Sequence, residues 1–513
     1  MSRLENSTKN LFLSLGNSIF SSLLGLISRT VFIYVLGSEY LGLAGLLGNV
    51  LGFLAISEIG IATAIGFSLY KPLAEKDYRS VSALMSVYRK AYAVIGIIVS
   101  LSGIVLFFTL DFFIPHEQQP AGTGFAYFAF LLNTVVGYFL SYKTTLISSD
   151  NQAFRLVPIN ISMNIVQTVS QIVILLLFKN YVAYLTVQIV CSIIIMFLQN
   201  RFISKKYDQV DFYSKDKLKP EQKKQLKRNI SGLIIAKIGD YLVNSTDNLI
   251  ITKLVSLAAT GIYSNYLLIR NMVNGYIATL FSSVTAGMGN VVAVESDGRK
   301  KEVFDIMMFC AYFIYSFEAV CFMCLFNPFI GDIWIGEQFL FDSFTVFIIV
   351  LNNFLTGLRI PLITMKSASG KYIEDAWIPF AFAAINLVAS IILAKYLGVA
   401  GVFLGTIVGS LLTADWYRPI VIYRHVFHSS VIDYYKRYVI YIILGLCNMA
   451  IAYFLCTLID TPYTIVSFIV KCIIAASVPL IINTLIFCKT KEFSAIKVMA
   501  GRILKKALGK FKR

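Results

Sequence analysis

The residues of this chain that could do chemistry are charged side chains inside long apolar runs. A charge at the centre of a lipid bilayer costs roughly 2.5–3.5 kcal/mol on insertion scales, so such residues usually face a cavity or a partner. The set therefore predicts a polar pathway, or a system of ion pairs, within a membrane. Its members are Arg29, Glu58, Lys237, Asp240, Asp247, Arg270, Glu318, Arg359, Asp415 and Lys471.

The cations of this set suit an anionic ligand. A guanidinium presents a planar fork of donors that matches two oxygens of a phosphate or pyrophosphate group. We therefore predict a cavity in which a pyrophosphate headgroup is bound by Arg29, Arg270, Arg359 and Lys237. Ion pairs that only support the structure are the alternative for each of them.

The carboxylates of the set have two interpretations. Buried acids in transporters often bind a coupling proton or sodium ion, but they can equally hold arginines in place. The candidates for a coupling-ion or lumen role are Glu58, Asp240, Asp247 and Glu318. Structural roles are favoured for Lys471 and for Asp415, which lies three residues before Arg418 and so on the same helix face.

The elements that must position these residues are membrane-spanning helices. Hydrophobic residues make up 57% of the 513 and charged residues only 14%, whereas about 25% of a soluble globular protein is charged. Apolar runs of about 20 residues are long enough to span a bilayer. Fourteen such runs predict an all-α polytopic membrane protein: 11–36, 41–70, 84–110, 123–147, 156–178, 183–203, 229–255, 262–293, 304–328, 341–366, 376–395, 399–423, 438–458 and 463–487.

The placement of Lys and Arg predicts the orientation. If the N-terminus is cytoplasmic, only Lys179, Lys253 and Lys395 of the 45 basic residues fall in loops on the outer side. Positive loops mark the cytoplasmic side, so we expect both termini there. This asymmetry, with attraction to anionic headgroups, accounts for the net charge of +17 without a nucleic-acid partner.

A basic segment divides the first twelve helices into two sets of six. Because six helices return the chain to its starting side, the two lobes should form a parallel pseudo-twofold repeat. Gly42 and Gly261 fit such a repeat, as do the Glu-x-Asp-x-Arg sequences at 75–79 and 295–299, each recurring after about 220 residues. The expected parts are an N-lobe at 1–203, a linker at 204–228, a C-lobe at 229–424, two extra helices at 425–487 and a basic, amphipathic tail at 488–513.

Signals for catalysis or metal binding are weak. Cys321 and Cys324 form a C-x-x-C sequence without a second pair or a nearby His, and His425 and His428 lack an acidic cluster. There is no Gly-rich phosphate loop, and the predicted outer loops are short. We expect no enzyme activity, no catalytic residue and no metal site.

Two stretches of the sequence carry short motifs in helices one to three and seven to nine. The first stretch is Leu-Gly-Ser-Glu-Tyr-Leu-Gly-Leu at 36–43 with Ser-Glu-Ile-Gly-Ile-Ala at 57–62 and Tyr-Lys-Pro-Leu-Ala at 70–74. The second is Asp-Asn at 247–248 with Gly-Ile-Tyr-Ser-Asn-Tyr-Leu-Leu-Ile at 261–269 and Gly-Asn at 289–290. Together they resemble the Wzx-type polysaccharide flippases of the multidrug/oligosaccharidyl-lipid/polysaccharide (MOP) exporter superfamily.

This resemblance implies alternating-access transport of an undecaprenyl-pyrophosphate-linked oligosaccharide across a bacterial cell membrane, from the inner to the outer leaflet. It implies a central cationic cavity lined by helices one, two, seven and eight, which places Arg29, Glu58, Asp247 and Arg270 in the lumen. It also implies polymerase and assembly proteins as partners, and extra helices that accommodate a lipid tail. No cofactor is expected, but a proton gradient, a sodium gradient or the membrane potential would drive transport.

Three other functions stay open from the sequence. A flippase for the peptidoglycan precursor would share the fold, the helix number and the lipid. A cation-coupled drug antiporter of the same superfamily usually has twelve helices. A membrane-embedded polymerase or glycosyltransferase would need an aqueous catalytic loop, which the short loops disfavour.

Overall fold

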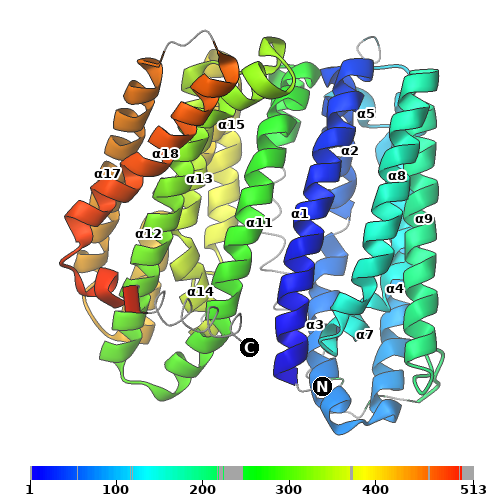
Figure 1. Cartoon of the computed structure of the whole chain (residues 1–513). Coiled ribbons are helices and arrows are strands. Elements are labelled where there is room, and N and C mark those ends of the chain that lie inside the picture. Colours follow the sequence, from blue (N-terminus) through cyan, green and yellow to red (C-terminus); the bar gives the residue numbers. More distant parts are fainter. Residues whose placement is uncertain are drawn as a thin grey trace, which may run out of the picture. The chain divides into compact units, whose positions relative to one another are not determined.

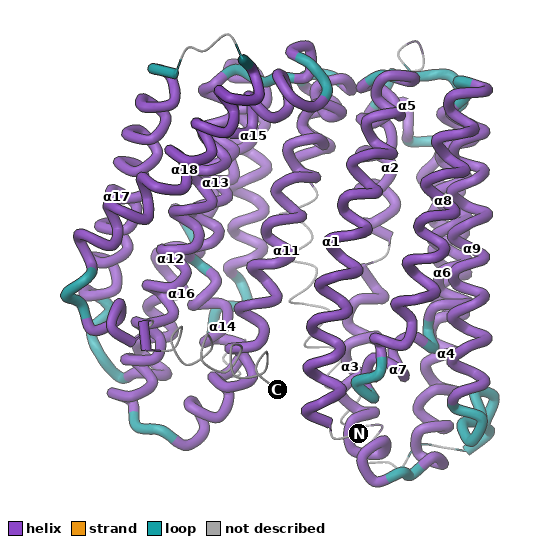
Figure 2. Tube along the Cα trace, viewed as in Figure 1, coloured by secondary structure: helices purple, strands orange, loops and turns teal. Residues whose placement is uncertain are grey.

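A computed structural model of the chain describes residues 3–54, 56–115, 117, 119–216, 218, 223, 246–369, 374–459, 463–495 and 497–498. All regular structure in these residues is helical (Figure 2). The chain forms two compact units, residues 1–267 and 268–513. Helix α11 (Leu257–Val294) begins in the first unit and continues into the second. The lobe boundaries expected around the 204–228 linker stay a prediction.

The first unit is a bundle of long helices joined by short turns (Figure 1). Helix α8 lies against α1 and α9, and α6 packs against α4 and α9. Its helices before α11 are α1 (Arg3–Leu36), α2 (Ser38–Leu54), α3 (Ile56–Glu75), α4 (Tyr78–Phe107), α5 (Leu110–Phe113), α6 (Thr123–Ser141), α7 (Thr144–Ser149), α8 (Val157–Phe178) and α9 (Tyr181–Lys206).

Local signals set the helix ends of this unit. Helix α1 ends at Gly37, whose φ of 86° is the left-handed conformation that glycine adopts without strain. Asp77 begins α4 by accepting a hydrogen bond from the Ser80 backbone N–H at 3.0 Å. Asn180 does the same for α9 with the N–H groups of Val182 and Ala183.

The second unit is arranged around α12, which contacts α13, α17 and α18. The α-helices of this unit after α11 are α12 (Asp297–Asn327), α13 (Ser343–Leu358), α14 (Ile360–Ser369), α15 (Ile378–Leu412), α16 (Ala414–Ile422), α17 (Ile432–Thr457) and α18 (Thr464–Phe487), with π-helical turns at Pro328–Trp334 and Tyr423–Phe427.

The long element α15 folds back on itself at Gly398. This glycine has φ 56° and ψ −131°, which lies outside the helical region. Across this break, Ser390 donates to the Val402 carbonyl and Asn386 donates to Thr406, so the two arms pack antiparallel. The break separates the predicted spans 376–395 and 399–423.

The two C-terminal helices attach to α12 through a buried polar network. Tyr312 of α12 donates to the side chain of Asn483 of α18 at 2.6 Å. Asn448 of α17 donates to Asn483 and to Ser316 of α12. Each such bond between membrane helices contributes roughly 0.6 kcal/mol, and about 1.7 at most. The network therefore fixes the register of α17 and α18 on α12 more than it adds stability.

The predicted all-helical, multi-pass fold class is confirmed. Ten stretches of the described residues are long and apolar enough to span a membrane, and one of them, Ile378–Phe427, contains the turn at Gly398. The predicted spans 41–70 and 262–293 correspond to α2–α3 and α11. The predicted span 229–255 lies mostly outside the described residues.

Two pairs of neighbouring helices recur in each unit, taken by itself. In the first unit α4 packs on α6 and α8 packs on α9. In the second unit α12 packs on α13, and the two arms of α15 pack on each other. Thus the third span of each predicted lobe contacts the fourth, and the fifth contacts the sixth. This order fits the predicted repeat.

Candidate functional site

Arg29 of α1 binds two side chains of α11 within the first unit. Its Nε donates to Oδ1 of Asn265 at 2.8 Å, and its Nη2 donates to the Ser264 hydroxyl. Tyr184 of α9 lies close to the guanidinium. Both acceptors are uncharged, so they hold the guanidinium in place without neutralising it. An anionic ligand that replaced them would gain a charge-assisted hydrogen bond.

Next to this contact, α2 and α11 touch backbone to backbone. A Cβ atom built on Gly261 would lie 1.9 Å from the Ser38 carbonyl oxygen, and one on Gly42 would lie 2.1 Å from the Leu257 carbonyl oxygen. Only glycine at both positions permits this approach. These are the two glycines that the predicted repeat aligns, so the contact joins helices assigned to different predicted lobes.

The other predicted residues of this region are less well defined. Asp247 is half-buried in the helical residues 246–254. Glu58 lies in α3, but its side chain is outside the described part of the structure, and Lys237 and Asp240 lie outside the described residues altogether. The expected position of Arg29 and Asp247 in one lumen stays a prediction, as do the roles of Glu58, Lys237 and Asp240.

Glu318 of α12 anchors a polar cluster inside the second unit. Its side chain is 3% exposed. Its Oε2 accepts a hydrogen bond from Nδ2 of Asn353 of α13 at 3.1 Å, and Asn353 accepts one from Asn274 of α11 at 2.9 Å. Its Oε1 has no hydrogen-bond partner among the described residues. An ionised carboxylate in this state is costly.

Arg270 of α11 is the positively charged residue near this cluster. It lies one turn from Asn274 and interacts with the charge of Glu318. Its Nη2 donates weakly to Asn271 at 3.4 Å, and its Nε is buried without a hydrogen-bond partner in the described residues. The predicted cation Arg270 and the predicted carboxylate Glu318 therefore belong to one polar cluster.

Arg359 has a different environment from Arg29. Its Nε lies 3.5 Å from Oδ1 of Asp415, and both side chains are buried. In the same unit, Asp375 forms ion pairs with Arg418 and with Lys366. The ion-pair interpretation therefore fits Asp415, although its partner comes from another helix and not from its own. A phosphate ligand of Arg359 would have to compete with this carboxylate.

The sequence analysis missed the carboxamides of these clusters. Asn265, Asn274 and Asn353 are the direct partners of the predicted charges, or link them. The available signal was the occurrence of Asn inside apolar runs, where an unpaired amide is also unfavourable. A search restricted to ionisable residues could not find them.

Comparisons with known proteins address the fold. No protein-family model matches the sequence, and no curated protein matches it. The structure is similar to the lipid II flippase MurJ in an inward closed conformation, with 14% identity and a TM-score of 0.66 over 93% of this chain and 99% of that one.

Two transporter structures are also similar. One is an inward-facing multidrug resistance MATE family transporter of the MOP superfamily, with 14% identity and a TM-score of 0.59 over 82% of this chain and 97% of that one. The other is the MATE transporter VcmN of Vibrio cholerae, with 12% identity and a TM-score of 0.52 over 84% and 99%. At these identities the similarity shows that the chain has the fold of MOP-superfamily proteins.

Proposed function

We propose that this chain is a flippase that moves an undecaprenyl-pyrophosphate-linked oligosaccharide repeat unit from the inner to the outer leaflet. The transported unit would serve the biosynthesis of capsular or other cell-surface polysaccharide. The observation that carries the proposal is the fold, which the chain shares with a lipid II flippase over 93% of its length. The Wzx-like sequence motifs favour an oligosaccharide repeat unit as the cargo.

Substrate binding would use cations that form no direct ion pair with an acidic side chain in the described part of the chain. Arg29 is held by the neutral groups of Ser264 and Asn265, and Arg270 keeps a buried Nε without a hydrogen-bond partner in the described part of the chain. A pyrophosphate could replace weak neutral partners with bidentate, charge-assisted bonds. Arg359 and Lys237 are secondary candidates, because Arg359 already binds Asp415.

The driving force would act through Glu318. The carboxylate is buried, has one oxygen without a hydrogen-bond partner among the described residues, and lies near Arg270. Protonation or binding of Na⁺ would remove the cost of burying its charge. A headgroup that binds Arg270 would change the charge near Glu318 and therefore its affinity for the proton or Na⁺. Glu58, Asp240 and Asp247 are the alternative coupling carboxylates.

The protein would be a multi-pass protein of a bacterial cell membrane with both termini in the cytoplasm. Its partners would be the lipid-linked oligosaccharide, membrane lipids and the enzymes of polymerisation and assembly, and it would need no cofactor. A peptidoglycan-precursor flippase is the second candidate, because a lipid II flippase has the same fold. The similarity to MATE transporters keeps a drug antiporter as the third.

The test is an analysis of lipid-linked intermediates in a strain that lacks the gene. The proposal predicts that one surface-polysaccharide repeat unit accumulates on the cytoplasmic side. The wild-type gene and the control variant Lys395→Ala should reverse the accumulation, since Lys395 is exposed at the end of the first arm of α15. Arg29→Ala should not reverse it, and Arg29→Lys should do so only partly because the fork of donors is lost.

The other outcomes separate the candidates. Accumulation of peptidoglycan precursor would identify the second candidate. Altered sensitivity to cationic drugs without accumulation of any lipid-linked glycan would identify the antiporter. Full rescue by both Arg29→Ala and Arg270→Ala would contradict the headgroup-binding role of these arginines.

A further inference from the structure

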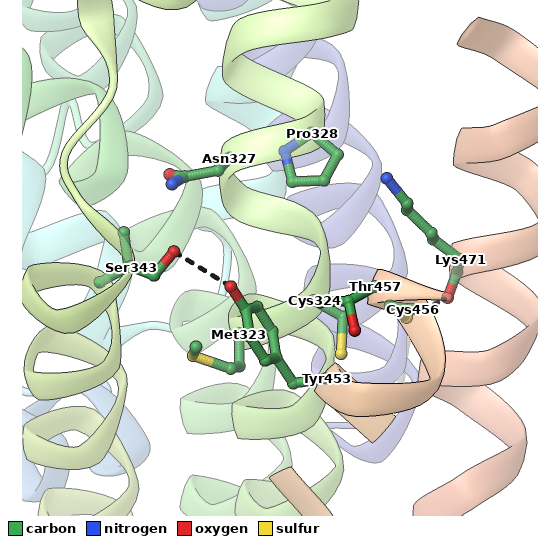
Figure 3. Close-up of a pocket in the computed structure, with 10 residues that line it drawn as sticks. Met323, Cys324, Asn327, Pro328, Ser343, Tyr453, Cys456, Thr457 and Lys471 are labelled. Atoms are coloured by element: carbon green, nitrogen blue, oxygen red, sulfur yellow. Dashed lines mark hydrogen bonds between the residues drawn. The ribbon is translucent and has the colours of Figure 1, made fainter. Parts of the chain in front are cut away.

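A small cavity lies in the second unit between the ends of α12 and α17, the start of α13 and the first half of α18 (Figure 3). Its volume is about 190 Å³. The residues that line it combine apolar, polar and charged side chains: Met323, Cys324, Asn327, Pro328, Ser343, Val346, Tyr453, Cys456, Thr457 and Lys471.

Lys471 is the charged group of this cavity. Among the described residues, no acidic side chain forms an ion pair with it. It lies seven residues after Thr464, the first residue of α18, which places it about 10 Å along the helix at 1.5 Å per residue. In Figure 3 its side chain extends from α18 toward Pro328. A cation at this depth without an acidic partner among the described residues indicates a functional site by default, and the expected ligand is an anion.

Hydroxyl groups supply hydrogen bonds on the opposite wall. Tyr453 of α17 donates to Oγ of Ser343 at 3.0 Å (Figure 3). Because Ser343 accepts this bond, its own hydroxyl hydrogen stays available to donate. Asp342, the nearest acid in sequence, directs its carboxylate to the backbone N–H groups of Phe344 and Thr345. The wall facing Lys471 thus offers a donor that suits an anionic oxygen.

The size and surroundings of the cavity limit the class of anion that it can bind. Sites for drug-sized ligands enclose about 300–1,000 Å³, so this cavity fits a phosphate-sized group and not a saccharide. Thr457, which lines the cavity near the end of α17, is exposed, and Leu458 beside it is 62% exposed. The cavity thus reaches the apolar surface of the helices, where a ligand enters from the lipid phase. An anion that carries an apolar chain meets both conditions.

We propose that this cavity binds the phosphate group of a membrane lipid, with Lys471 as the cation and Ser343 as a hydrogen-bond donor. By the charge pattern, the start of α18 lies on the outer side of the membrane, so the lipid belongs to the outer leaflet. The site is separate from the polar cluster around Glu318 and does not depend on which substrate is transported. Its chemistry fits a glycerophospholipid or a polyprenyl diphosphate.

The test measures lipid binding to the purified full-length chain in detergent by native mass spectrometry. The probes are dioleoylphosphatidylglycerol, farnesyl diphosphate, inorganic phosphate and dioleoylglycerol, which lacks a phosphate. In Lys471→Gln the dissociation constant for a phosphate-bearing lipid should rise about tenfold, as expected for the loss of one charge-assisted hydrogen bond. Ser343→Ala should show a smaller rise. Lys395→Gln, the matched loss of another lysine in the same unit, should show none.

The outcomes are distinguishable. If Lys471→Gln raises the dissociation constant of phosphatidylglycerol or of farnesyl diphosphate more than that of the other, the result supports the proposal and identifies the lipid. Equal binding of all lipids by the wild type and Lys471→Gln overturns it and leaves Lys471 as a lysine that only extends toward the interface. Competition by inorganic phosphate as strong as by the lipids also overturns it. Lys471→Arg keeps the charge and must retain binding, which guards against a fold defect in Lys471→Gln.

Discussion

The backbone contact between α2 and α11 gives a sharp prediction about the conformational cycle. In Gly261→Ala the new Cβ would lie 1.9 Å from the Ser38 carbonyl oxygen, while real Cβ contacts are essentially never shorter than 3.0 Å. The helices must therefore separate by roughly an ångström or more. Overpacking of this kind costs about 1–3 kcal/mol.

If alternating access breaks this contact, Gly261→Ala will favour the state in which it is broken. A difference of 1–3 kcal/mol changes the population ratio about 5- to 150-fold. Gly48→Ala is the control, because it adds a Cβ to α2, the other helix of the contact, with no atom within 4 Å. It also controls for the higher helix propensity of alanine, which is worth roughly 1 kcal/mol.

The assay is the rate at which a membrane-impermeant thiol reagent labels Ser264→Cys, in a background whose eight native cysteines are replaced. Ser264 lies three residues after Gly261 on α11, so it becomes accessible when α2 and α11 separate. The rate should rise by at least fivefold in Gly261→Ala and stay unchanged in Gly48→Ala. Equal rates in the two variants, with both proteins folded, would refute the idea that this contact opens.

Three further predictions follow from the buried charges and the linker. Glu318→Gln should keep its bond with Asn353 and leave the melting temperature unchanged or higher, because it removes a buried carboxylate whose Oε1 has no hydrogen-bond partner in the described residues. Export should fall at least tenfold, and normal export would exclude Glu318 from coupling. Asp415→Ala should destabilise the protein by about 3–5 kcal/mol because it leaves Arg359 buried without its partner; a thermal unfolding curve that matches the wild type would contradict this role. Co-expression of the chain cut within residues 204–228 should retain transport, and total loss with both halves inserted would contradict simple movement of two lobes.

The sequence could predict the spans because hydrophobic length alone decides whether a helix crosses a bilayer. The separation of 376–395 from 399–423 is an example, since Gly398 adopts a conformation that ends a helix. The sequence could also single out Arg29 and Glu318 as charged side chains within apolar spans, because an ionisable side chain in an apolar run stands out without any knowledge of its neighbours. Their roles in transport stay predictions.

Partners in space could not be predicted in the same way. Arg359 pairs with Asp415, which is distant in sequence, whereas the sequence offered Arg418 as a nearer candidate for Asp415. The cavity around Lys471 combines four helices whose relative packing no periodicity reveals. The sequence analysis favoured a structural role for Lys471, because a sequence does not show whether an acidic partner lies close in space. In the described residues, no acidic side chain pairs with it.

The most direct test of flippase activity uses proteoliposomes that contain the purified chain and a fluorescent undecaprenyl-pyrophosphate-linked oligosaccharide in both leaflets. A lectin added outside measures how much glycan becomes accessible. The account predicts that nearly all the glycan becomes accessible with the wild type, whereas only the initial outer fraction does so with Arg29→Ala. An accessible fraction that stays at the initial value with the folded wild-type protein, with an imposed proton or sodium gradient of either sign, would contradict it.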